Sequence, residues 1–192
     1  MLTTIYQPGA AVRPRGRVET LAALYRPYFN QQSWDGYHEN LYIPPEKPAG
    51  RPAVARMGNI LHFSFPIFTA YYEFAVPAYK YLFRNCVELG LPDPLLRVEN
   101  MPACAQATVM RQGRRRLIHL LAYMPELRGR ATQVIEEPLD VRDVTVWLRR
   151  DGRPVRSARL ALSGAPLPVR TRGEYDGVLA PRVCGYELLA LE

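Results

Sequence analysis

Apolar residues follow two different periods along this chain, and the change falls near Pro92. Before Pro92, apolar side chains occur in continuous runs or at helical spacing. Beyond it they alternate with polar residues, the pattern of antiparallel strands with one buried face. Pro92-Asp93-Pro94 is a stiff segment between the two patterns. The pattern therefore predicts two regions, residues 1–93 and 94–192.

The first region begins with irregular, proline-punctuated sequence. Thr3–Tyr6 is compatible with a strand, and Arg17–Tyr25 fits either a strand or a helix. Asn30–Gly50 has little periodicity, and loops of that length are usually functional or mobile. Asn59–Phe65 is almost wholly apolar, which is typical of a parallel strand buried on both faces.

Helical spacing follows this apolar run, but Pro77 interrupts it. A proline inside a helix costs roughly 3 kcal/mol, whereas the first helical position accepts one. We therefore expect a short turn at Ile67–Glu73 and a separate helix that begins near Pro77 and ends at Gly90.

The second region consists of apolar–polar alternation divided by glycine-containing turns. The turns at Gly113, Asp151-Gly152 and Arg172-Gly173 each predict a hairpin. This spacing predicts an antiparallel sandwich of about seven strands. The expected strands are Ala105–Gln112, Arg116–Tyr123, Val144–Arg149, Pro154–Leu160, Leu167–Thr171, Glu174–Leu179 and Tyr186–Leu191.

The predicted fold class is α+β, with a partial α/β module followed by a small antiparallel β-sandwich. A single strand–helix unit cannot cover both faces of a parallel sheet. We therefore expect the first region to be incomplete, with its remaining strands and helices upstream of Met1.

Charge and composition narrow the possible functions. The net charge of +7 comes almost wholly from arginines, which are scattered rather than clustered, apart from Arg114-Arg115-Arg116. We therefore expect no nucleic-acid partner. The sequence has neither a run of about 18 apolar residues nor a signal-peptide pattern at its start. The predictions are no membrane partner and a cytoplasmic location.

Cysteines and histidines show no spacing typical of a metal or redox site. Cys86, Cys104 and Cys184 are odd in number and far apart, which favours buried or half-buried thiols. His62 and His119 lie in apolar strands, where hydrogen-bonded core histidines are expected. We expect no metal and no cofactor.

Several segments resemble a family of bacterial glycoside hydrolases that carry a β-galactosidase-type trimerisation domain. Many members of this family are described as α-L-fucosidase-like. Weaker similarity reaches back through residues 27–30. The strongest stretches are Gly58–Phe68 with Tyr71 and Ala78-Tyr79, then Leu91–Leu95, Ile118–Gly129 (IHLLAYMPELRG) and Val134–Glu137.

The resemblance implies a larger parent protein that processes carbohydrate. In such proteins a TIM barrel comes first, then a class I glutamine amidotransferase-like α/β domain, then a small β domain. This chain would be the end of the second domain and the whole of the third. A barrel needs about 250 residues. The resemblance therefore implies an upstream TIM-barrel partner, a homo-oligomer, and no catalytic residue in this chain.

The residues themselves offer little catalytic chemistry. Glycosidases need two carboxylates facing one sugar site, and Glu136 and Glu137 on a strand would point to opposite faces. Amidotransferases need a cysteine at a sharp strand-to-helix turn, whereas Cys86 lies in a predicted helix. The other candidates for a catalytic carboxylate are Glu39, Glu46, Glu73, Glu126, Asp140 and Asp143, and we expect them to be solvated or to anchor turns.

Residues 33–42 (SWDGYHENLY) combine aromatic and polar side chains on the long loop. Aromatic faces pack against sugar C–H groups, while carboxylates and amides bind hydroxyls. We therefore expect Trp34, Tyr37, His38 and Glu39 to line the rim of a sugar site formed with the barrel.

Two other functions are compatible with the sequence. The chain would be a subunit that complements a separately encoded hydrolase barrel, or a free-standing carbohydrate-binding module with Trp34, Tyr37 or Trp147 as stacking platforms. The tyrosines of Tyr71-Tyr72 and Tyr79-x-Tyr81 extend more than once around their helix. One face suits core packing and the other an oligomer contact.

Overall fold

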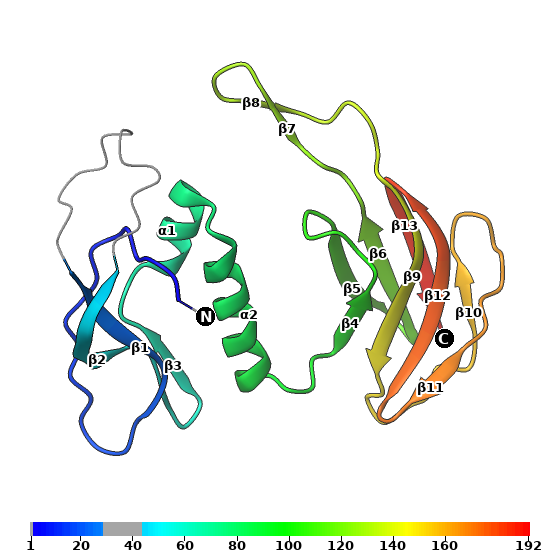
Figure 1. Cartoon of the computed structure of the whole chain (residues 1–192). Coiled ribbons are helices and arrows are strands. Elements are labelled where there is room, and N and C mark those ends of the chain that lie inside the picture. Colours follow the sequence, from blue (N-terminus) through cyan, green and yellow to red (C-terminus); the bar gives the residue numbers. More distant parts are fainter. Residues whose placement is uncertain (1, 29–43) are drawn as a thin grey trace. The chain divides into compact units, whose positions relative to one another are not determined.

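A computed structural model describes residues 2–28 and 44–192 (Figure 1). The chain divides into two compact units, Met1–Pro92 and Asp93–Glu192. Unit 1 contains β1 (Glu19–Pro27), β2 (Pro45–Met57), β3 (Ile60–Phe63), α1 (Ile67–Phe74) and α2 (Pro77–Gly90). Its three strands form one antiparallel sheet in the order β1-β2-β3.

The apolar run at residues 59–65 forms part of a hairpin, so the prediction of a buried parallel strand is wrong. Strand β3 pairs antiparallel with β2 around Gly58, whose φ is +57°. Ile60 is 61% exposed, and His62 is exposed rather than part of a core. The amidotransferase-like interpretation rested on a parallel sheet, and this antiparallel pairing gives it no support.

Helices α1 and α2 are separated at Pro77, as predicted. Ala75 ends α1 in the left-handed conformation with φ 48°, and Pro77 occupies the start of α2. Ile67 and Ala70 of α1 and Tyr79 and Cys86 of α2 are buried against the sheet core. The predicted short turn is a helix of two turns.

The N-terminal segment contacts the helical layer without forming a strand. Residues 3–6, predicted as a strand, pair with no other strand of the described chain. Instead the Tyr79 hydroxyl donates to the Thr4 carbonyl, and Ala10 N–H donates to the Ser64 carbonyl at 2.7 Å. The ring of Tyr6 packs against Phe74, with centroids 4.9 Å apart.

Unit 2 is built from antiparallel strands, as predicted. One four-stranded sheet has the order β10-β13-β6-β5 and the other β11-β12-β9-β4. The strands are β4 (Leu96–Glu99), β5 (Gln106–Gln112), β6 (Arg115–Leu121), β7 (Glu126–Arg128), β8 (Thr132–Val134), β9 (Asp140–Arg149), β10 (Ala158–Leu160), β11 (Arg170–Arg172), β12 (Tyr175–Cys184) and β13 (Tyr186–Leu191).

The two four-stranded sheets pack face to face over one apolar core. Ile118 and Leu120 of β6 meet Val144 and Val146 of β9, and all four are fully buried. Alternate residues of each strand face this core, which is why the sequence alternates. Burial of each such side chain stabilises the fold by about 1.5–3 kcal/mol.

Local turn chemistry predicted two hairpins of unit 2 and misled on a third. Strands β5 and β6 pair around Gly113, and β11 and β12 pair around Gly173. The strands that flank Asp151-Gly152 belong to different sheets, because β9 pairs with β12 and β10 with β13. Of the two turn residues, only Gly152 has positive φ, whereas a two-residue type I′ hairpin needs both.

Strands β7 and β8 form a separate two-stranded hairpin that extends away from the two sheets (Figure 1). Its Leu127 is 64% exposed, and Ile135 just beyond it is 51% exposed. Arg128 pairs with Glu126 at 3.0 Å and with Glu136 at 2.8 Å. This hairpin contributes nothing to the apolar core of the sandwich.

Replacing Leu120 with alanine should destabilise unit 2 by about 2–5 kcal/mol, because it leaves a cavity between the sheets. Leu162→Ala is the matched control, since Leu162 is 67% exposed and should change stability by less than about 0.5 kcal/mol. Chemical denaturation followed by circular dichroism measures both. Equal effects of the two substitutions would contradict the face-to-face core.

Candidate functional site

The predicted rim residues Trp34, Tyr37, His38 and Glu39 lie outside the described part of the chain. Their role at a sugar site therefore stays a prediction. The described residues offer two other surfaces of interest: an aromatic and arginine-rich sheet face on unit 2, and an apolar helical face on unit 1.

Several carboxylates in the described residues are engaged by arginines. Arg182 Nε donates to Asp140 Oδ1 at 2.8 Å, and Arg142 donates to Oδ2 at 3.1 Å. These contacts hold the pKa of Asp140 below its ordinary value, and the hydrogen bond from Arg182 has the largest effect. Glu192 accepts Arg115 at 2.7 Å. Because its pKa is lowered, Asp140 is unsuited to act as a glycosidase's general acid.

The one carboxylate buried in the described residues is Asp176, which is 2% exposed. It accepts the Val155 N–H at 2.8 Å and the Thr171 hydroxyl at 3.1 Å, and Arg150 Nε lies 3.4 Å away. These contacts join the crossover after β9 to β11 and β12. Asp176 is therefore a structural residue that satisfies buried donors.

His119 of β6 and Tyr186 of β13 form a pair on the outer face of the sheet β10-β13-β6-β5. His119 Nδ1 lies 2.9 Å from the Tyr186 hydroxyl, as expected for a hydrogen-bonded sandwich histidine. Within the described residues, no group of three or more histidines, cysteines or acids is placed to hold a metal ion.

The thiols differ in accessibility. Cys86 is 3% exposed, and burial raises its pKa. Cys104 and Cys184 are exposed, so the prediction that all three are buried or half-buried is wrong for these two. Cys104 lies in a turn and Cys184 is the last residue of β12, and at such positions the apolar period gives no information on burial.

The first surface is the outer face of the sheet β11-β12-β9-β4, which we call the tryptophan face. Its members are the residues that alternate with the core residues on these strands. Trp147 of β9 lies at its centre, with Gly177 of β12 and Arg97 of β4 opposite it in the pairing. The other members are Glu99, Thr145, Arg149, Arg170, Arg172, Tyr175 and Leu179.

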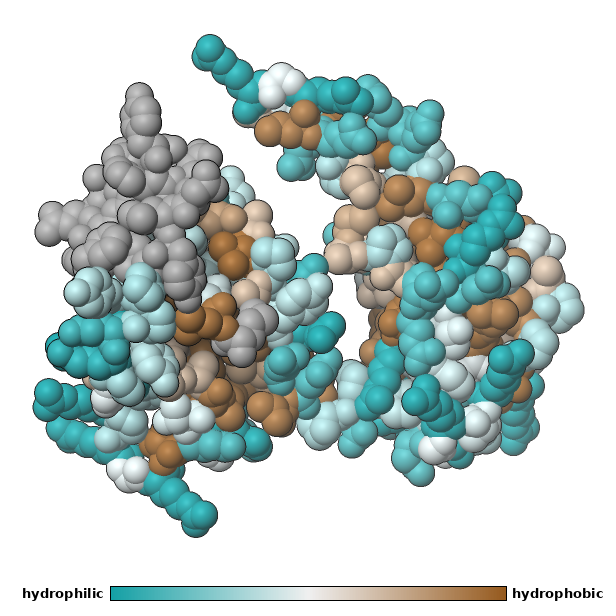
Figure 2. Space-filling model, in the orientation of Figure 1, coloured by the Kyte–Doolittle hydropathy of each residue, from teal (hydrophilic) through white to brown (hydrophobic). Residues whose placement is uncertain are grey.

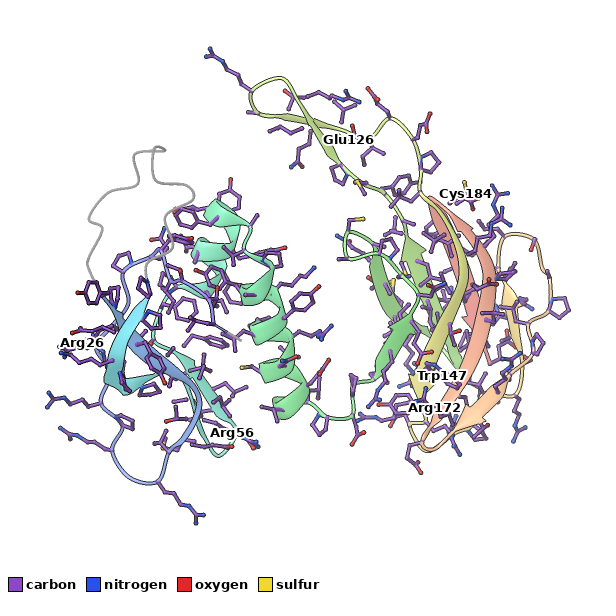
Figure 3. The ribbon with its side chains drawn as sticks, viewed as in Figure 1. Arg26, Arg56, Glu126, Trp147, Arg172 and Cys184 are labelled. Carbon is purple, nitrogen blue, oxygen red and sulfur yellow. The ribbon has the colours of Figure 1, made fainter. Side chains whose placement is uncertain are left out.

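Gly177 determines how Trp147 lies on this face. A Cβ atom at position 177 would be 2.2 Å from the indole ring, so the ring packs directly against the β12 backbone. The Arg172 guanidinium carbon lies 5.6 Å from the ring centroid, and Figure 3 shows the two side chains at the same end of the sheet. The Arg97 guanidinium carbon likewise lies over the Tyr175 ring, 4.7 Å from its centroid.

The second surface is the helical face of unit 1. Side chains that point away from the core include Phe68 (67% exposed), Tyr72 (89%) and Tyr81 (45%). Figure 2 shows hydrophobic surface gathered on the side of unit 1 that carries α1 and α2. Large exposed apolar patches mark interaction sites in soluble proteins.

No helix in residues 2–28 and 44–192 is long and apolar enough to cross a membrane.

Comparison with protein-family models and with curated proteins gives no match. Solved structures do match this chain in fold. The α-L-fucosidase isoenzyme 2 from Paenibacillus thiaminolyticus superposes with a TM-score of 0.80 at 21% sequence identity. The match covers 91% of this chain and 27% of that chain. This chain therefore has the fold of about a quarter of that fucosidase.

The Asp140 ion pairs give a pH prediction. In Arg182→Ala the pKa of Asp140 should rise toward its ordinary value of 3.8. Because the folded pKa is lowered, the contact stabilises the fold above the ordinary pKa and is lost as pH falls through the lowered value. Carbon-13 NMR titration of the Asp140 carboxyl measures the shift, with Arg159→Ala as control. An unchanged Asp140 pKa in Arg182→Ala would contradict this contact.

Proposed function

We propose that this chain is a non-catalytic accessory and assembly region of a glycoside hydrolase related to α-L-fucosidases or β-galactosidases. The observation that carries the proposal is the fold match over 91% of this chain, which accounts for only 27% of the fucosidase chain. Asp140 also supports it, because its ion pair with Arg182 lowers its pKa and a general acid must be protonated.

The helical face of unit 1 is the part that docks against the catalytic domain. Exposed aromatic residues at the centre of a patch are the usual anchors of protein interfaces. Phe68 packs against Phe83 with ring centroids 4.8 Å apart, so the patch is held in place before docking. The Tyr81 ring is flanked by Lys80 and Arg84, which form a polar rim.

The catalytic TIM barrel is joined to this chain in a longer polypeptide or complements it as a separate subunit, and the assembly is a homo-oligomer. In either arrangement the segment with Trp34, Tyr37, His38 and Glu39 reaches the sugar site of the barrel. In both arrangements the barrel must cover the helical face, because the apolar side chains of this face need a partner surface.

The proposal is tested by affinity purification of a hydrolase on the immobilised chain. Extract of the source organism is passed over the 192-residue chain, and bound material is assayed with aryl α-L-fucosides and β-D-galactosides. We expect no turnover by the purified chain and retained activity on the column. Phe68→Ser with Tyr72→Ser should lower the retained activity at least about tenfold, which corresponds to roughly 1.4 kcal/mol of binding.

Leu162→Ser is the matched control, because Leu162 is as exposed as Phe68 but lies on unit 2. Circular dichroism verifies that each variant folds. Turnover by the purified chain would contradict the non-catalytic assignment. Equal retention by the double variant and the control would contradict docking through the helical face.

A further inference from the structure

The tryptophan face carries a surplus of positive charge beside its two aromatic rings. Arg97, Arg149, Arg170 and Arg172 project from it, against Glu99 as the single carboxylate among the described residues of this face. Arg149 donates to the Asp93 carbonyl, and Arg97 pairs with Asp93 at 3.5 Å. Arginine forks held in this way are already oriented for an incoming anion.

Arg172 is the guanidinium nearest the indole of Trp147. It comes from β11 and forms a 3.1 Å ion pair with Glu99 Oε1 on β4, at the opposite edge of the sheet. The side chain therefore crosses the outer surface above β12 and β9. This pair is exposed, with 70% and 53% of the two side chains accessible. Exposed pairs of this kind contribute little to stability and exchange partners readily.

Trp147 has one ring face against Gly177 and the other toward Arg172. Its Nε1–H is buried and has no acceptor among the described residues. A buried donor without an acceptor carries a free-energy cost that a ligand oxygen would remove. Movement of Arg172 away from the ring would open the outer ring face.

We infer that the tryptophan face binds an acidic saccharide, a chain that contains uronic acid residues. The sugar ring stacks on the outer face of Trp147, and its carboxylate takes the place of Glu99 as the partner of Arg172. A ligand hydroxyl or carboxylate oxygen accepts the Trp147 Nε1–H. Stacking selects a sugar over other anions, and the arginine fork selects an acidic sugar over a neutral one.

This inference is independent of the docking proposal, because every residue of the tryptophan face belongs to unit 2. A free module would use the same face to hold a polysaccharide, and an assembled hydrolase would use it to stay near an acidic substrate. Failure of one proposal therefore leaves the other intact.

The experiment is isothermal titration calorimetry of the whole chain with an oligogalacturonate of defined length. Arg172→Ala should weaken binding at least about tenfold, because the saccharide carboxylate loses its fork. Glu99→Gln should strengthen binding about threefold or more, because Arg172 no longer has a competing carboxylate. If the Arg172–Glu99 ion pair were purely structural, both substitutions would weaken oligogalacturonate binding or leave it unchanged.

Arg159→Ala is the matched control, since Arg159 is an exposed arginine paired with Glu192 on the other sheet. A neutral oligogalactoside of equal length should bind at least about tenfold more weakly than the oligogalacturonate. Polyglutamate tests charge alone and should also bind weakly. Absence of oligogalacturonate binding, equal binding of polyglutamate, or equal affinity of Arg172→Ala and Arg159→Ala would overturn the inference.

Discussion

Among the described residues, the two units bury apolar surface in different ways. In unit 2 two antiparallel sheets enclose Ile118, Leu120, Val144 and Val146 between them, so the core is closed on both sides. In unit 1 a three-stranded sheet and two short helices enclose a smaller cluster and leave Phe68 and Tyr72 exposed. The exposed aromatic side chains of unit 1 are the physical basis for its proposed docking role.

Much of the fold could be predicted where sequence neighbours are also spatial neighbours. The hairpins at Gly113 and Gly173 and the helix boundary at Pro77 depend on local backbone chemistry that the sequence records directly. The antiparallel pairing of the strand at Ile60–Phe63 and the crossover at Asp151-Gly152 could not be predicted in the same way. Partner choice there depends on distant strands, about which a local apolar run or turn carries no information.

The functional surfaces were only partly predictable. The interpretation of Glu136-Glu137 assumed a strand, whereas both residues follow the end of β8 at Val134. The ion pairs of Asp140 with Arg182 and of Glu192 with Arg115 join neighbouring strands, which only the structure identifies. Trp147 was a candidate stacking platform from its residue type alone. The packing of Trp147 against Gly177 and its proximity to Arg172 depend on the cross-strand register, which cannot be read from the sequence.

The central claim is that unit 1 requires an external partner surface, and hydrogen exchange of the purified chain tests it most directly. Amides of β6, β9, β12 and β13 should exchange at least roughly 100-fold more slowly than those of α1 and α2, because the sandwich encloses the larger core between two sheets. Protection of α1 and α2 equal to that of the sandwich strands would show a self-sufficient unit 1 and would contradict the account.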